Sequence, residues 1–173
     1  MSYTNYLAAV ELINNNNALV KENATMQRFV QSIEDVQEAE VILGTTFPDS
    51  YKEFLITFSK MAFQGECIYG LGDKNEYQNQ NYVYSNIICN TLDERKVNTD
   101  PPFPESFVVI YDLGDGEKFC LDTSKMNSEG ECPVIAWYFG RIEPLYEDFG
   151  AFFLETVTAG LKSLEEDGNK VHW

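Results

Sequence analysis

Two strand-like runs joined by a short glycine-rich turn set the strongest limit on how this chain folds. The stretch FVVIYDLGDGEKFCLD, residues 107–122, places β-branched and aromatic residues on both sides of a Gly-Asp-Gly triplet at 114–116. Glycine adopts the positive φ angles that a tight turn between antiparallel strands requires. The sequence therefore predicts a β-hairpin, with Asp112, Asp115 and Glu117 at or beside its turn.

The acidic residues of this turn do not have the spacing of a calcium-binding loop. An EF-hand loop needs oxygen ligands at alternating positions and a glutamate at its last position, whereas Asp112, Asp115 and Glu117 stand at offsets 0, 3 and 5. Asp122 ends the second run, where we expect it to accept hydrogen bonds from the backbone of the following turn. We therefore predict no metal or cofactor site in this stretch.

Helical patterns flank the strand-like runs. Apolar residues recur at helical spacing around residues 6–13, 29–39 and 87–92, and the second of these patterns stops at Gly44. The stretch that starts at Leu145 has the same periodicity and predicts a final helix. Helices before and after consecutive strands are typical of the α+β class.

The most clearly bounded of the predicted helices lies in FPDSYKEFLITF, residues 47–58. Pro48 suits the first turn of a helix, since its missing N–H has no partner to lose there. Ser50 and Glu53 have the spacing of a capping box. Large apolar residues then follow on one helical face, so this helix is expected to pack against the core.

We predict a single α+β domain over residues 1–173, with a central antiparallel sheet and helices at its N- and C-terminal ends. A length of 173 residues fits one domain. A third strand is predicted in CPVIAWYF, residues 132–139, and the proline-rich stretch 98–104 is predicted to be an irregular connector. Residues 1–32 are expected to form an N-terminal helical extension, and residues 165–173 a frayed tail.

The charge of the chain limits its partners. Twelve lysines and arginines stand against 28 aspartates and glutamates, which gives a formal net charge of −16. A surface this acidic repels nucleic acid and anionic lipid, and it attracts cations and basic proteins. We therefore predict neither a nucleic-acid nor a membrane partner.

The cysteines and the apolar runs indicate a compartment. None of Cys67, Cys89, Cys120 and Cys132 lies in a C-x-x-C pair. The first residues lack the basic region and uninterrupted apolar core of a signal peptide, and no apolar stretch reaches the roughly 20 residues that span a bilayer. We therefore expect a cytoplasmic protein with reduced thiols.

The residue types needed for common enzyme chemistry are scarce. The one histidine, His172, is expected to lie on the frayed tail, which is a poor place for a general base. The sequence contains no G-x-S-x-G motif and no Walker loop. A non-enzymatic interaction module is thus favoured, while an acid site assembled from distant residues with a metal ion stays open as an alternative.

The stretch IEDVQEAEVILGTTFPDSYKEFLITFS resembles the opening of the SMI1/KNR4 (SUKH) superfamily. The residues that carry this resemblance are Glu40, Leu43, Gly44, Phe47, Pro48, Tyr51, Phe54 and Leu55. The hairpin stretch, closed by Asp122, resembles the paired strands of the family, and PVIAWYF and DFGAFFLETV resemble its last strand and C-terminal helix. The resemblance covers roughly residues 33–157.

The resemblance implies an α+β fold without catalysis or a cofactor. Many bacterial members are immunity proteins that bind and neutralise a cognate polymorphic toxin, frequently a nuclease, and fungal relatives are regulatory scaffolds. A basic toxin domain is therefore the expected partner, with a scaffold role without a toxin as the alternative. The residues expected to meet the partner are acidic or aromatic and lie on three segments: Asp112, Asp115 and Glu117; Asp73, Glu76 and Tyr77; and Asp93 and Glu94.

Overall fold

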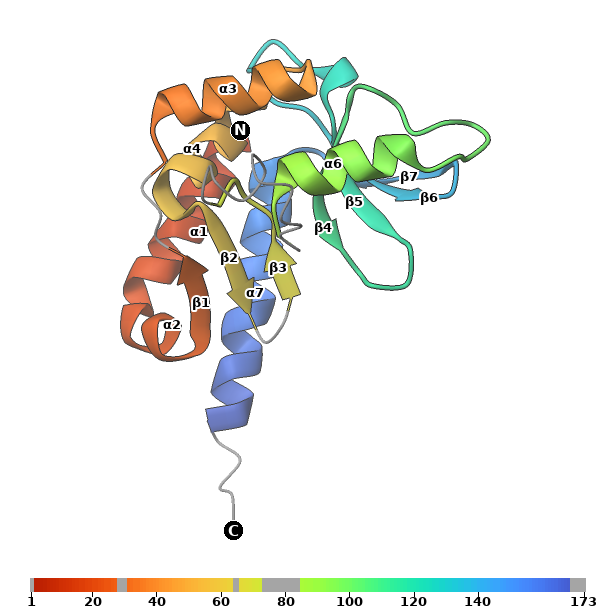
Figure 1. Ribbon diagram of the computed structural model, residues 1–173. Coiled ribbons are helices and arrows are strands. Elements are labelled where there is room, and N and C mark those ends of the chain that lie inside the picture. Colours follow the sequence, from red (N-terminus) through yellow and green to blue (C-terminus); the bar gives the residue numbers. More distant parts are fainter. Residues whose placement is uncertain (1, 28–30, 64–65, 73–84, 169–173) are drawn as a thin grey trace.

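Six helices and two antiparallel sheets make up the described part of the computed structural model, which is residues 2–27, 31–63, 66–72 and 85–168 (Figure 1). The helices are α1 (Ser2–Asn15), α2 (Asn17–Asn23), α3 (Ile33–Leu43), α4 (Asp49–Phe58), α6 (Ile87–Lys96) and α7 (Phe149–Gly168). The strands are β1 (Ala24–Gln27), β2 (Lys60–Phe63), β3 (Glu66–Ile68), β4 (Phe107–Asp112), β5 (Lys118–Asp122), β6 (Val134–Tyr138) and β7 (Arg141–Tyr146). The predicted α+β class is confirmed.

The two sheets differ in size and in their place in the chain. A small sheet has the order β1-β2-β3, and a larger sheet has the order β4-β5-β6-β7. Every pairing between neighbouring strands is antiparallel. The chain just after β3 joins the two sheets, because the Tyr69 N–H donates a hydrogen bond of 2.8 Å to the carbonyl oxygen of Ile110 in β4.

The hairpin predicted from the Gly-Asp-Gly triplet is confirmed. Strands β4 and β5 pair from Phe107 opposite Asp122 to Asp112 opposite Lys118. Gly114 and Gly116 have φ angles of +83° and +100°. These angles explain why glycine stands at both positions, since L-residues with a side chain rarely adopt them.

The boundaries of α3 follow local sequence signals. Ser32 caps the first turn, since its Oγ accepts the Asp35 N–H at 3.2 Å while the Asp35 carboxylate accepts the Ser32 N–H at 2.8 Å. This reciprocal arrangement is a capping box. The helix ends at Gly44, which has a φ angle of +67°, as the sequence predicted. Ile33, which was expected to face inward, is 45% exposed because the helix begins at that residue.

The capping box predicted for α4 is wrong. The helix begins at Asp49 with Pro48 in the cap position, and no side chain of the first turn closes it. Ser50 is instead buried inside the helix, and Glu53 is exposed. The Glu131 carboxylate does the capping, since it accepts the Ser50 N–H at 2.9 Å and the Ser50 hydroxyl at 2.6 Å.

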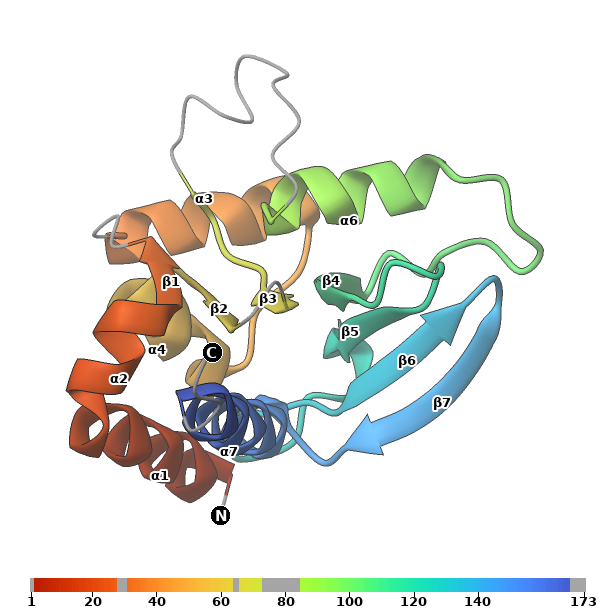
Figure 2. The same cartoon turned by 90° about the horizontal axis from the view of Figure 1, so that it is seen from below.

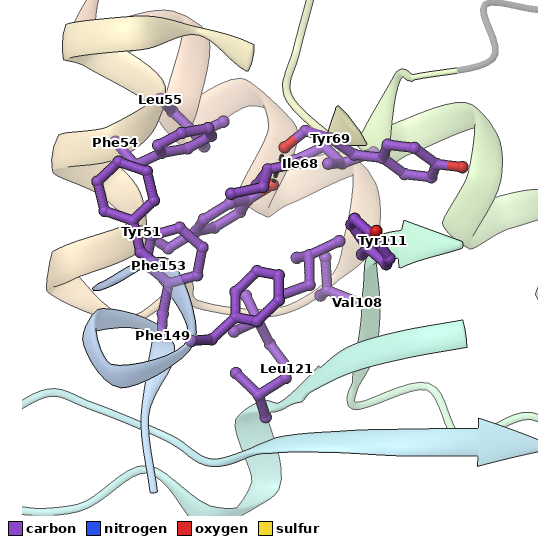
Figure 3. Close-up of a cluster of buried hydrophobic side chains, with 14 of the residues drawn as sticks. Tyr51, Phe54, Leu55, Ile68, Tyr69, Val108, Tyr111, Leu121, Phe149 and Phe153 are labelled. Carbon is purple, nitrogen blue, oxygen red and sulfur yellow. Dashed lines mark hydrogen bonds between the residues drawn. The ribbon is translucent and has the colours of Figure 1, made fainter. Parts of the chain in front are cut away.

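Aromatic rings make up the centre of the core, where α4 packs against α7 (Figure 3). Tyr51 of α4 meets Phe149 of α7 edge to face, with ring centroids 4.8 Å apart. Phe54 meets Phe153 at 5.3 Å in the same way. Because full burial of one large apolar side chain contributes about 1.5–3 kcal/mol, this cluster is a main source of stability.

Helix α1 packs along α7 on the side away from the larger sheet (Figure 2). Tyr6 stacks on Phe153 with ring centroids 5.7 Å apart. Ile13 is also buried, whereas Leu7 is 51% exposed. The buried residues of α1 therefore form one stripe along the helix. The N-terminal helix therefore belongs to the packed body of the domain.

The C-terminal elements differ from the prediction in two places. Leu145 and Tyr146 belong to β7, and the last helix begins only at Phe149. Helix α7 continues to Gly168, past residue 165 where the tail was expected to fray. Strands β1, β2 and β7 were not predicted, whereas the proline-rich connector has no regular element, as expected. Among the described helices, none has the length and apolar composition needed to cross a membrane.

Candidate functional site

The register of the larger sheet separates its residues into two faces. Directly paired residues lie on the same face of an antiparallel sheet. Asp112, Lys118 and Trp137 share one face by this rule, and Tyr111 and Phe119 share the other. Figure 2 shows β4 and β5 between α6 and α7, with α6 beside the first face and α7 beside the second. The same hairpin thus contributes to two different environments.

An ion pair between the last residue of β4 and the first residue of β5 closes the turn of the hairpin on the α6 side. Lys118 binds the Asp112 carboxylate, and the two side chains are only 19% and 13% exposed. The other Asp112 carboxylate oxygen accepts the Gly114 N–H at 2.7 Å. Asp112 was expected to present its charge to a partner, but in the structure this charge is neutralised within the hairpin.

The tip of the hairpin carries the acidic groups that remain available. Asp115 is exposed and Glu117 is half-buried. The Asp115 carboxylate accepts the Glu117 N–H at 3.0 Å, and the Leu113 N–H donates to the Glu117 carbonyl oxygen at 3.1 Å. These bonds hold the backbone of the tip in one shape and fix the position of the Asp115 carboxylate.

The tip of the β6–β7 hairpin lies against the tip of the β4–β5 hairpin. A Cβ atom at Gly116 would lie 3.1 Å from Cε2 of Phe139. Phe139 is 58% exposed and Tyr138 is 44% exposed, and their rings meet edge to face at 4.9 Å. Two exposed aromatic rings therefore stand beside the turn that carries Asp115 and Glu117.

Glu94 of α6 lies near the ion pair of Asp112 and Lys118, so the structure brings two of the expected segments together. The pKa of the Glu94 carboxyl is raised, chiefly because burial disfavours its charged form, and Asp112 adds to the rise. Lys118 and the Trp137 indole oppose it. Trp137 Nε1 has no partner with hydrogen-bond geometry in the described part of the chain, so its effect on Glu94 is that of a longer polar contact. Asp93 instead points outward and pairs with Lys96 at 2.7 Å.

The raised pKa of Glu94 predicts how a substitution changes stability with pH. A carboxyl with a higher pKa in the folded state binds more protons when folded, so its contribution to stability falls as pH rises through that pKa. The free energy of unfolding of the wild type, relative to Glu94→Gln, should therefore decrease between about pH 4 and neutral pH. Denaturant titrations of both proteins across this range test the expectation. Asp93→Asn, compared with the wild type in the same way, is the control. The prediction is contradicted if the wild type loses no more stability relative to Glu94→Gln than relative to Asp93→Asn as the pH rises, or if it gains stability.

Three of the expected partner residues cannot be placed. Asp73, Glu76 and Tyr77 lie outside the described residues. His172 lies outside them as well. The hairpin tip and α6 therefore supply every expected site residue that the structure locates.

Asp122 has the turn role expected of it, with different donors. Its carboxylate accepts the Ser124 hydroxyl at 2.6 Å and the Lys125 ammonium at 2.9 Å, whereas backbone donors were predicted. The side chain is 3% exposed. Asp122 therefore stabilises the end of β5 and is not presented to solvent.

The described acids and thiols form neither a metal-binding cluster nor a disulfide. Across residues 2–27, 31–63, 66–72 and 85–168, no group of three or more His, Cys, Asp or Glu side chains is placed to hold a metal ion. The four cysteines are free thiols, and Cys120 and Cys132 are buried. Burial, with a smaller effect of nearby carboxylates, raises the pKa of the Cys132 thiol to about 12. Such a thiol stays protonated and is a weak nucleophile at neutral pH.

A groove of about 440 Å³ opens between α7 and the Tyr111–Phe119 face of the larger sheet. The residues that line it come from five elements and the hairpin turn: Phe63, Tyr111, Leu113, Phe119, Tyr146, Phe152, Glu155, Thr156, Ala159, Gly160 and Ser163. Five of these are aromatic, and Glu155 is the charged residue among them. Sequence reasoning missed the groove, because it assigned Tyr146 to a helix and because no local pattern reports how a helix docks on a sheet.

One wall of the groove is held by a polar contact between strand and helix. The Tyr146 hydroxyl of β7 donates to the Glu155 carboxylate of α7 at 3.1 Å. The pKa of Tyr146 is raised, chiefly because burial disfavours the phenolate and also because Glu155 is adjacent. At the other end, Phe63 packs over Gly160, where a Cβ atom would lie 2.6 Å from the ring. Glycine is therefore required for this close approach of β2 to α7.

Comparison with protein-family models gives a match over most of the chain. The SUKH_5 family model, described as SMI1-KNR4 cell-wall, matches residues 9–158. A search of curated proteins gave no match. The matched range begins in α1, earlier than the resemblance read from the sequence, and it contains α6, the whole hairpin and the first half of α7.

Proposed function

The chain belongs to the SMI1-KNR4 (SUKH) family, and on this basis we propose that it is a non-catalytic immunity protein that binds and neutralises a cognate toxin domain. The observation that supports this most is the hairpin tip, where the hairpin's own hydrogen bonds fix the Asp115 carboxylate and the backbone of Glu117. Neither carboxylate forms an ion pair with a lysine or arginine of the described residues. Their charge is therefore available to a basic partner.

A basic nuclease domain is the kind of toxin that fits this charge best. Nucleases bind phosphates through lysine and arginine, so their substrate sites are positively charged. A protein with a formal net charge of −16 is attracted to such a site, and its carboxylates occupy the place of the phosphates. Complementary charge accelerates the encounter more than it strengthens the final complex.

The decisive experiment uses the toxin domain encoded beside this chain. Co-expression with the chain should restore growth, and the two proteins should purify as one complex. An active toxin that still kills, with a folded chain that forms no complex, would refute the proposal. The chain would then be a scaffold with a different partner.

Charge reversal at the hairpin tip should slow association with that toxin domain. For Asp115→Lys with Glu117→Lys, we expect a fall in the association rate constant of about three- to tenfold at low salt, and a smaller difference at 1 M salt where charges are screened. The matched control is Glu165→Lys with Glu166→Lys, which changes the net charge equally on the exposed last turns of α7. Stopped-flow or surface-based kinetics at several salt concentrations measure the effect. Equal slowing in both double variants would remove the hairpin tip from the interface.

A further inference from the structure

The larger sheet keeps part of one face uncovered. Phe152 of α7 packs on Tyr111 and Phe119 with ring centroids 6.0 and 6.1 Å apart, and the groove begins beside these rings. Leu113 forms the outer edge of the groove and is 47% exposed. Outside the groove, the rings of Tyr138 and Phe139 at the tip of the β6–β7 hairpin are also exposed.

The residues that line the groove indicate which chemical groups bind in it. Five of its eleven lining residues are aromatic, and the one charge among them is the Glu155 carboxylate. Asp115 and Glu117 lie on the same hairpin as Leu113 and extend the negative charge past its outer edge. An apolar group next to a positive charge therefore complements the groove, because aromatic rings attract cations as well as apolar atoms.

The size of the surface indicates a protein segment and not a small molecule. A volume of about 440 Å³ is within the range of ligand pockets. However, small-molecule sites enclose most of their ligand, whereas here Leu113 at the edge of the groove is exposed and the exposed rings of Tyr138 and Phe139 lie outside it. Exposed apolar patches with polar rims mark protein interaction sites.

From these observations we infer that the groove between α7 and the larger sheet is the anchor site of the partner protein, which inserts one large apolar side chain flanked by arginine or lysine. The inference rests on the proposed toxin-binding function and adds to it the place and the chemistry of the contact. The apolar side chain fills the space between Phe152, Leu113 and Ala159. The flanking cations meet Glu155 on one side and the hairpin carboxylates on the other.

A blocked tripeptide amide with the sequence arginine–tryptophan–arginine tests the groove without the toxin. In NMR titrations of the full chain, we expect saturable shifts of the Leu113 and Ala159 methyl signals, with the methyl signals of the 81% exposed Val41 unmoved. Replacing tryptophan by glycine in the peptide should weaken binding at least about tenfold, because the apolar anchor is lost. Replacing both arginines by glutamate should weaken it about fivefold or more.

A pair of helix-surface variants links these shifts to the groove. Ala159→Lys places a long cation in the groove and should weaken binding of the tripeptide at least about fivefold, whereas Ala18→Lys makes the same change on exposed α2 and should have no effect. Absence of the Leu113 and Ala159 shifts at saturating millimolar peptide would overturn the inference. So would equal affinity for the glycine peptide, since charge alone would then explain binding.

The same two variants separate this inference from the proposed function. If the wild-type chain and both variants bind the neighbouring toxin domain equally, the immunity function stands and the groove is not its anchor. If the wild type does not bind that toxin but the tripeptide still fills the groove, the proposed function fails and the anchor site remains. Loss of toxin binding in Ala159→Lys alone, with the tripeptide result above, supports both.

Discussion

Replacement of Glu131 by alanine is expected to lower the free energy of unfolding by about 2–3 kcal/mol. The carboxylate lies 81 positions along the chain from Ser50 and accepts both its N–H and its hydroxyl. Ser50 is fully buried, so removal of the acceptor leaves two buried donors without a partner, and water does not reach them. An unsatisfied buried polar group costs about 1–3 kcal/mol, and hydrogen bonds to a charged group are stronger than neutral ones.

Glu53→Ala is the contrasting variant, because the sequence alone assigns the capping role to Glu53. This residue is exposed and makes no capping bond, so its replacement should change the free energy of unfolding by less than about 0.5 kcal/mol. Chemical denaturation of the two variants under identical conditions decides between the local and the long-range cap. A large loss for Glu53→Ala together with a small loss for Glu131→Ala would show that the local capping box forms after all.

Replacement of Lys118 by methionine is expected to lower the free energy of unfolding by about 1–3 kcal/mol. Methionine keeps much of the length and apolar stem of lysine but removes the charge that Asp112 binds. The Asp112 side chain is 13% exposed, and Glu94 lies near it with a carboxyl that burial already disfavours as an anion. Removing Lys118 therefore leaves two carboxylates close together with little water to screen them.

The exposed pair of Asp93 and Lys96 supplies the matched control. It joins the same residue types at 2.7 Å, but its side chains are 49% and 73% exposed. Exposed ion pairs contribute about 0–1 kcal/mol, so Lys96→Met should cost clearly less than Lys118→Met. In denaturant titrations, an equal loss in the free energy of unfolding for both variants would mean that the burial of Asp112 and Lys118 has no influence on the strength of their ion pair.

The parts of the fold that were predicted correctly depend on neighbours in the sequence. The β4–β5 hairpin follows from Gly114 and Gly116, whose positive φ angles are set by the turn itself. The end of α3 follows from Gly44 for the same reason. Such signals need no knowledge of the rest of the chain, since the conformational freedom of glycine is local.

The incorrect predictions lie where contacts with residues distant in the sequence determine the structure. The motif at Ser50 and Glu53 is a regular capping box by spacing, but Glu131 supplies the bonds and turns Ser50 inward. Leu145 and Tyr146 extend the apolar pattern of α7 toward its N-terminal side, yet they belong to β7, in which Tyr146 pairs with Val134 of β6. Periodicity cannot detect a strand that directly precedes a helix when both are apolar.

Part of the candidate site was predicted. The rest was missed because it also depends on residues that are distant in the sequence. The acidic hairpin tip was identified correctly as a turn, but the pairing of Asp112 with Lys118 depends on the register of two strands. The groove depends on the docking of α7 against Tyr111, Phe119 and Tyr146, which belong to three different strands. A sequence lists these aromatic residues without indicating that they share one surface.

The packing of α1 against α7 has a consequence for the time at which the protein is complete during synthesis. Tyr6 is made roughly 150 residues before its stacking partner Phe153. At about 5–20 residues per second, a ribosome needs on the order of ten seconds to make the intervening chain. The first helix therefore emerges long before the surface that buries it, and its apolar stripe is open to chaperones until the last helix leaves the exit tunnel.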